Sequence, residues 1–219
     1  MELIRDNLYV IRNAKIFPSN TYVLKDDVSD RCIIIDPGFD FELIDNNIYE
    51  KKLKPVSIVS THGHFDHVGS AAFFKNKFNI PFYLHEGDLK ICQSANFYLK
   101  MAQLNHKIET PSPDYLFKGE FEKISISGFD LSVYNFPGHS KGSCIIKIKN
   151  FLFSGDIIYK NGLGSGSIPR EDKPLLKQSL LKIFDVFVDG DLILPGHGQA
   201  ETLGKIKENN LKLKNFISN

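Results

Sequence analysis

The run Thr61-His-Gly-His-Phe-Asp-His67 constrains this chain more than any other feature, because it gathers three imidazoles and one carboxylate. A helix would point His62 and His64 apart, whereas a loop that leaves a strand can turn both inward. Imidazole nitrogen and carboxylate oxygen are ligands that suit zinc, and also iron or manganese. A surface loop does not require three closely spaced imidazoles and a carboxylate. The run therefore predicts a metal site in which the ligands are His62, His64, Asp66 and His67.

Three later segments share one pattern, in which an apolar run ends in a tight glycine turn that precedes an imidazole or a carboxylate. The residues delivered in this way are His139, Asp156 and His197. Strand ends gathered at one edge of a layered fold are a usual place for a site. One ion needs about four ligands. These three residues and the four of the first run therefore suit two ions, which can share a bridging hydroxide and lower its pKa towards neutrality.

A single Gly-His pair is a weak signal, and His139 or His197 taken alone would be interpreted as a turn residue or a surface imidazole. Their order behind the dense run favours the metal interpretation. His85 and His106 fit no part of the pattern. His85 follows an apolar run and could end a strand. Both are predicted to be structural or surface residues.

Short apolar runs that are rich in β-branched or aromatic residues recur along the chain and predict strands. Helical candidates lie between them, and Asp172 before Lys-Pro is typical of a helix N-cap. Because strands run together at the start and again from about 120 to 154, the order favours a sandwich of two sheets with helices outside. The expected strands are Leu8–Ile11, Thr21–Leu24, Cys32–Ile35, Val56–Val59, Phe82–Leu84, Ile124–Ile126, Leu131–Phe136, Cys144–Ile148, Phe151–Phe153 and Leu192–Leu194, and the expected helices are 41–52, 67–78, 86–102, 172–186 and 201–217.

Length and composition predict one domain over residues 1–219 without wholesale disorder. The formal net charge of +1 gives no overall basic field, so no nucleic acid is expected as a partner, although a local patch stays open. The N-terminus lacks the pattern of a signal peptide, no apolar stretch has transmembrane length, and no membrane partner is expected. Cys32 and Cys144 open apolar runs and are expected to be buried free thiols, which favours a cytoplasmic location.

Residues 94–119 are the least regular region of the sequence. Asn96, Asn105, Pro111, Ser112 and Pro113 interrupt the periodic pattern there. A long insertion of this kind is usually a surface loop or linker, and less often a lid over an active site. Both interpretations stay open.

These motifs resemble those of the metallo-β-lactamase superfamily. His62-Gly-His-Phe-Asp-His67 matches its His-x-His-x-Asp-His element, and Asp36-Pro-Gly38 matches a turn typical of the fold. Pro137–Ser140, Ser154–Asp156 and Pro195–Gly198 resemble its later elements, in the same order. The resemblance implies an αβ/βα sandwich of two mixed sheets flanked by helices. It also implies two divalent ions, with zinc as the first choice and iron or manganese as alternatives. His62, His64 and His139 would hold the first ion, Asp66, His67 and His197 would hold the second, and Asp156 would bridge the two.

Within the superfamily the sequence is most similar to the glyoxalase II group, the hydroxyacylglutathione hydrolases and their short bacterial relatives. Asp156 speaks against a true β-lactamase. Gly164–Ser167 stands where the group usually carries Gly-Arg-x-Asp, and the chain continues for only 22 residues after His197, so glutathione recognition by the usual route is not expected. Tyr159 lies where quorum-sensing lactonases carry a tyrosine that assists the substrate carbonyl. Its alternative interpretation is an ordinary packed aromatic.

The resemblance therefore implies hydrolysis of a thioester, ester or lactone of a small molecule, with Asp66 orienting the nucleophile and accepting or passing on its proton. An iron-dependent oxygenase of the persulfide dioxygenase type, using His62, His139 and Asp156, is an alternative. The missing Arg-x-Asp pair argues against it. A nuclease is a more distant alternative because the charge is near neutral, and a silent metal-binding module is another. The oligomeric state stays open.

Overall fold

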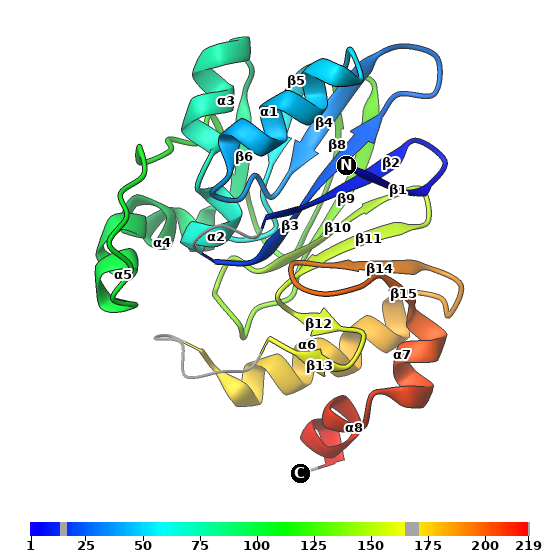
Figure 1. The fold of residues 1–219 in the computed structure, drawn as a ribbon. Helices are drawn as coiled ribbons and strands as arrows, with labels where there is room; N and C mark the ends of the chain where they lie inside the picture. Colours follow the sequence, from blue (N-terminus) through cyan, green and yellow to red (C-terminus); the bar gives the residue numbers. More distant parts are fainter. Residues whose placement is uncertain (14–16, 165–170, 219) are drawn as a thin grey trace.

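A computed structural model describes residues 1–13, 17–164 and 171–218, and two sheets form its centre (Figure 1). The first sheet has seven strands in sequence order, and the second has six in the order β15-β14-β11-β10-β9-β8. A short hairpin, β12 (Ile158–Tyr159) and β13 (Gly162–Leu163), stands apart. The first sheet contains β1 (Glu2–Arg5), β2 (Leu8–Asn13), β3 (Ser19–Lys25), β4 (Arg31–Ile35), β5 (Lys54–Val59), β6 (Phe82–His85) and β7 (Tyr115–Phe117), and the second contains β8 (Phe121–Ile126), β9 (Phe129–Asn135), β10 (Cys144–Ile148), β11 (Phe151–Gly155), β14 (Leu192–Pro195) and β15 (Glu201–Thr202).

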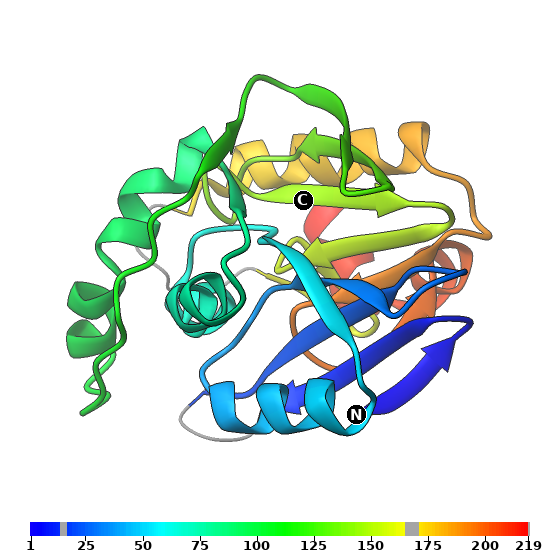
Figure 2. The ribbon, with the colours of Figure 1, turned by 90° about the horizontal axis from the view of Figure 1, so that it is seen from above.

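The two sheets pack face to face, with helices on both outer sides. Tyr22 of β3 and Phe153 of β11 meet edge to face in the core between the sheets. A second core lies under α1 (Phe41–Glu50) and α3 (Ala71–Phe78), and a third lies under α6 (Lys173–Val186). Figure 2 shows α1 and α6 on opposite outer faces, with the sheets between them. The expected αβ/βα sandwich is confirmed.

Strand direction sets where the predicted ligands emerge. In the first sheet β4, β5 and β6 are parallel, so their carboxyl ends share one edge. In the second sheet β9 and β11 both run antiparallel to β10, and β11 runs parallel to β14. The carboxyl ends of β9, β11 and β14 therefore also share one edge. Connections that leave these ends can meet at one site.

All ten predicted strands are present. The structure adds β1, β7, β12, β13 and β15, which are too short or too polar to give an apolar run. Helix α1 and helix α6 match their predictions, and the N-cap of α6 is confirmed because Asp172 accepts a hydrogen bond from the Leu175 amide at 3.0 Å. Cys32, Cys92 and Cys144 are buried free thiols, as expected for the first and last of them.

Three helix predictions were wrong in their continuity. Residues 67–78 divide into α2 (Phe65–Val68) and α3, and residues 86–102 divide into η1 (Glu86–Asp88), α4 (Leu89–Gln93) and α5 (Ala95–Met101). Residues 201–217 begin in β15 and then divide into α7 (Leu203–Asn209) and α8 (Leu211–Ser218). Asn210 causes the last break: its side chain accepts the Leu213 amide and donates to the carbonyls of Tyr159 and Gly162.

The region 94–119 is more ordered than the sequence suggested. Helix α5 and strand β7 form its two ends, and residues 102–114 between them have no regular structure. Leu99 and Ile108 are buried against Phe39, with Phe65 packed beside them. Among the described residues, no helix combines the length and the apolar character needed to cross a membrane.

Candidate metal centre

Four of the predicted ligands lie close together in residues 62–67, just beyond β5 of the first sheet. Beyond β5 an extended loop carries His62 and His64, and His64 then caps the short helix α2, which holds Asp66 and His67. The backbone of His64 is extended, with φ of −68° and ψ of 149°. All four side chains are buried. The change from extended loop to helix turns all four towards the edge where the second sheet ends, as the spacing predicted.

The second sheet supplies the other three. His139, Asp156 and His197 lie shortly beyond the carboxyl ends of β9, β11 and β14. His139 and Asp156 are buried, and the His197 side chain is 26% exposed. His197 is therefore the member of the set that solvent reaches most easily.

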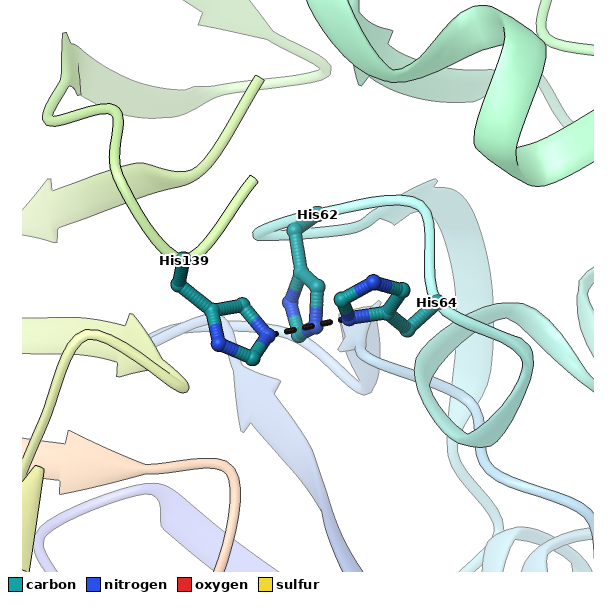
Figure 3. Close-up of side chains that lie close together, drawn as sticks. All are labelled: His62, His64 and His139. Carbon is teal, nitrogen blue, oxygen red and sulfur yellow. Dashed lines mark hydrogen bonds between the residues drawn. The ribbon is translucent and has the colours of Figure 1, made fainter. Parts of the chain in front are cut away.

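His62, His64 and His139 form the first group. One ligand nitrogen from each lies within 4.8 Å of the others. His139 Nε2 is 2.9 Å from His64 Nδ1 (Figure 3), and the His62 ring is edge-on to both neighbours at centroid distances of 4.7 and 4.9 Å. Figure 3 shows the three rings converging from two different loops. Three imidazoles in this arrangement offer a ligand set of the kind zinc uses.

Asp66, His67, Asp156 and His197 form the second group. His67 Nε2 lies 3.3 Å from Asp66 Oδ2 and 3.4 Å from Asp156 Oδ1. His197 Nε2 lies 3.3 Å from Asp66 Oδ2 and 3.2 Å from Asp156 Oδ2. Two imidazoles and two carboxylates thus alternate around one point, which suits a divalent cation.

Asp156 is the member that connects the groups. Its Oδ2 atom lies 3.2 Å from His197 Nε2 in the second group and 3.8 Å from His139 Nε2 in the first. A carboxylate with one oxygen between two clusters has the geometry that a bridging ligand requires.

The free ligand atoms indicate that a cation fits here. Among the described residues, His62 Nε2, His67 Nε2 and Asp156 Oδ1 are buried side-chain atoms without a hydrogen-bond partner. Buried polar atoms without partners cost free energy, and such atoms are rare in folded proteins. A bound metal would supply the missing partner of each.

Histidines of the two groups differ in pKa. Burial, followed by the neighbouring His139, lowers the pKa of His64 to about 4, and burial with His67 holds the pKa of His62 well below its usual value. Burial alone would lower the pKa of His197, but Asp156 and Asp66 raise it to about 10. His62 and His64 are thus neutral at pH 7 and ready to bind a cation, whereas protons compete with a metal for His197.

Asp36 supports the second group from behind. Its Oδ2 lies 3.1 Å from His67 Nδ1, and its two oxygens also accept the Thr61 amide and hydroxyl, each at 2.7 Å. The Asp36 backbone has φ of +52°, a conformation that few residues other than glycine adopt. A carboxylate on the far nitrogen of a ligand histidine fixes the ring's orientation and raises its basicity. The sequence identified Asp36 only as part of a turn.

Asp36→Asn is expected to weaken metal binding at the second group, where Asp36 contacts the His67 ring directly. An amide cannot accept hydrogen bonds on both sides, so either His67 or Thr61 loses its partner. Loss of such a contact lowers metal affinity by about 10- to 100-fold. Competition with a zinc chelator measures this, with the exposed Asp30→Asn as control. Unchanged affinity for both ions would exclude this role for Asp36.

Tyr159 lies at the mouth of the centre. Its ring is edge-on to His197 at a centroid distance of 5.9 Å. Burial and the adjacent Asp156 carboxylate hold the pKa of its hydroxyl well above the usual value, so that hydroxyl stays protonated. Tyr159 and His197 also line a pocket of 620 Å³. The remaining lining residues are Lys160, Asn161, Gly162, Leu163, Gly198, Gln199, Lys212 and Phe216.

The structure also places the remaining residues that the sequence singled out. His85 ends β6 and is structural: its ring accepts the Gly87 amide, and its other nitrogen lies 3.0 Å from the Gly119 carbonyl. His106 is an exposed residue whose ring contacts Phe39. In the stretch Gly164–Ser167, only Gly164 lies within the described residues, and its carbonyl is 2.8 Å from His139 Nδ1. Asp88, a buried carboxylate behind the first group, was missed altogether.

An αβ/βα sandwich with paired histidine and aspartate groups at one edge defines a class of metallo-hydrolases. The chain belongs to the metallo-β-lactamase superfamily, since the model of that family matches residues 14–197. It is similar to the hydroxyacylglutathione hydrolase GloC of Haemophilus influenzae, with 31% identity over 197 residues, which cover 89% of this chain and 92% of the relative.

Two solved structures resemble the chain closely. BLEG-1, described as a B3 metallo-β-lactamase, superposes with a TM-score of 0.85 and 30% identity, over 94% of this chain and 99% of the other. TTHA1623, solved in a di-iron-bound form, gives a TM-score of 0.81 and 27% identity, over 93% of this chain and 98% of the other. The superfamily and the fold predicted from the motifs are both confirmed.

Proposed function

We propose that this chain is a two-metal hydrolase that cleaves a thioester, ester or lactone of a small molecule. The observation that carries the proposal is the pair of ligand groups joined through Asp156, with a pocket opening beside them at His197 and Tyr159. The di-iron form of TTHA1623 supports two ions per chain. The donor set suits zinc first and iron or manganese as alternatives.

The chemistry would be shared between the ions and the chain. Two bound divalent ions polarise a carbonyl and lower the pKa of a water molecule. Asp66 is ionised, because His67 and His197 outweigh the effect of burial and hold its pKa well below the usual value. Its carboxylate can therefore orient the attacking water and accept a proton from it. The protonated Tyr159 hydroxyl can donate a hydrogen bond to the substrate carbonyl or to the leaving group.

The pocket suggests a leaving group that carries negative charge. Lys160 is paired with Glu201 at 3.4 Å, whereas Lys212 has no hydrogen-bond or ion-pair partner among the described residues. The pocket thus presents one uncompensated cation on α8. An anion on the substrate would gain an exposed ion pair there, worth up to about 1 kcal/mol.

Lys212→Gln is expected to raise KM about three- to fivefold for a thioester whose thiol carries a carboxylate. This is the size expected for loss of one exposed ion pair between Lys212 and the substrate. KM for the matching carboxamide thioester should not change. Steady-state kinetics on both substrates measure the effect, and Lys214→Gln on the same helix is the control. Equal changes for both substrates would show that the charge of Lys212 is not recognised.

The experiment that tests the proposed function is a substrate panel on the zinc-loaded protein. We expect turnover of thioesters or lactones that is lost on dialysis against a chelator and restored by zinc. A penicillin or cephalosporin belongs in the panel because the similarity to BLEG-1 favours lactam hydrolysis as a second candidate function. Asp156 argues against lactam hydrolysis. Turnover of the lactam or of a phosphodiester alone, or full activity without metal, would overturn the proposal.

A further inference from the structure

A buried carboxylate lies behind the first ligand group, where the two sheets meet. Asp88 ends the short 3-10 helix η1, directly after β6, and its side chain is fully buried. It belongs to neither ligand group. A buried carboxylate is costly unless its oxygens are fully hydrogen-bonded.

Asp88 accepts hydrogen bonds from both loops that carry the first group. Its Oδ2 accepts the Gly63 amide at 2.9 Å and the Ser140 hydroxyl at 2.6 Å, and its Oδ1 accepts the Gly142 amide at 2.7 Å. Gly63 stands between His62 and His64, and Ser140 follows His139. One side chain therefore ties the loop of the first sheet to the loop of the second.

The loops of both sheets pack closely against the backbone at Asp88. A Cβ atom on Gly63 would lie 2.7 Å from the Asp88 carbonyl oxygen, and a Cβ atom on Gly142 would lie 2.6 Å from its amide nitrogen. Both loops thus touch the backbone of η1 as well as the carboxylate. The relative position of His139 and the His62–His64 loop is fixed through this contact.

The second group has a different support. Asp36 contacts His67, and the hydrogen bonds of Asp88 go to Gly63, Ser140 and Gly142, not to a residue of the second group. Asp88 therefore contacts only the loops of the first group. Asp36 contacts the second group directly through His67 and reaches His62 only through the Thr61 hydroxyl. Supporting contacts behind ligands are worth about 10- to 100-fold in metal affinity.

We propose that Asp88 is a positioning residue that sets His139 against His62 and His64, and so determines the affinity of the first metal position without acting on the second. The inference rests on the two-metal centre of the proposed function. An asparagine cannot replace Asp88, because its NH2 group would face either the Gly142 amide or the Gly63 and Ser140 donors. One buried donor would then stay unpaired.

The test is a cobalt titration of purified protein, followed by calorimetry and visible absorption. Wild type is expected to take up two ions per chain. Asp88→Asn is expected to bind one ion with wild-type affinity and the other about 10- to 100-fold more weakly. X-ray absorption spectroscopy of Asp88→Asn with one ion bound should then show two imidazole ligands, as in the second group. Three imidazole ligands would correspond to the first group. Glu86→Gln, an exposed acid on the same turn, is the matched control.

Several results would overturn the inference: both ions bound by Asp88→Asn as tightly as by wild type, both weakened equally, or three imidazoles around the ion retained. If Asp88→Asn does not fold, Ser140→Ala removes one of the three hydrogen bonds and should weaken the same position by a smaller factor. If wild type binds two ions but hydrolyses no carbonyl substrate, the proposed function is refuted. The role of Asp88 is then still decided by the metal titration alone.

Discussion

Asp66→Ala should lower kcat/KM for the best thioester or lactone by at least about 1,000-fold, the equivalent of several kcal/mol of transition-state stabilisation. The substitution removes a carboxylate oxygen that lies 3.3 Å from both His67 Nε2 and His197 Nε2. The second group then has one carboxylate fewer, and the attacking water loses its acceptor. Bound metal should fall from two ions per chain towards one.

Kinetics and elemental analysis on the same sample measure both effects. Asp185→Ala removes an exposed carboxylate from α6 and should leave activity and metal content unchanged. An Asp66→Ala protein that retains full activity would contradict the role assigned to this residue.

Gly196→Ala should lower kcat/KM by about 100-fold, since small displacements of reacting groups have effects of this size. A Cβ atom here would lie 2.2 Å from Asp156 Oδ1 and 2.5 Å from His67 Cε1. The backbone cannot retreat, because the Gly196 amide donates to the Gly155 carbonyl and its own carbonyl accepts the Asn20 amide. One added methyl group must therefore displace ligands of the second group.

Gly190→Ala is the matched control for this substitution. A Cβ atom on Gly190, at the opposite end of β14, meets nothing within 4 Å, so activity and metal content should not change. If Gly196→Ala keeps the activity of the control, the close approach of Gly196 to the ligands does not matter for function.

The grouping of the seven candidate ligands was predictable because its signals are local. His62, His64, Asp66 and His67 are adjacent in sequence, and His139, Asp156 and His197 each follow a strand and a glycine turn. Strand ends can be recognised one at a time from apolar runs. Parallel alignment of β9, β11 and β14 then brings the ends together without further information.

The supports behind the ligands were not predictable, because they depend on strand register. Asp36 reaches Thr61 only because Ile35 of β4 pairs with Val59 of β5. Asp88 meets the Gly142 amide across 54 residues of chain. Neither contact leaves a pattern in the sequence on either side of it, since register is set by the whole sheet.

Helix continuity failed for a similar reason. Periodicity alone suggested a single helix over 67–78, but the chain divides at Gly69 and Ser70, whose amide bonds to the Pro37 carbonyl. The break in the last segment likewise depends on Asn210, whose side chain bonds the hairpin of β12 and β13. Tertiary hydrogen bonds outweighed local propensity at both places.

Seven side chains are proposed to hold two ions, and elemental analysis of the purified protein is the most direct test of that claim. Wild type should carry about two divalent ions per chain after reconstitution, with zinc preferred. His62→Ala and Asp66→Ala should each lower that number, and no oxygen should be consumed with glutathione persulfide. One iron per chain with oxygen uptake on that substrate, or full hydrolytic activity in metal-stripped protein, would contradict the claim.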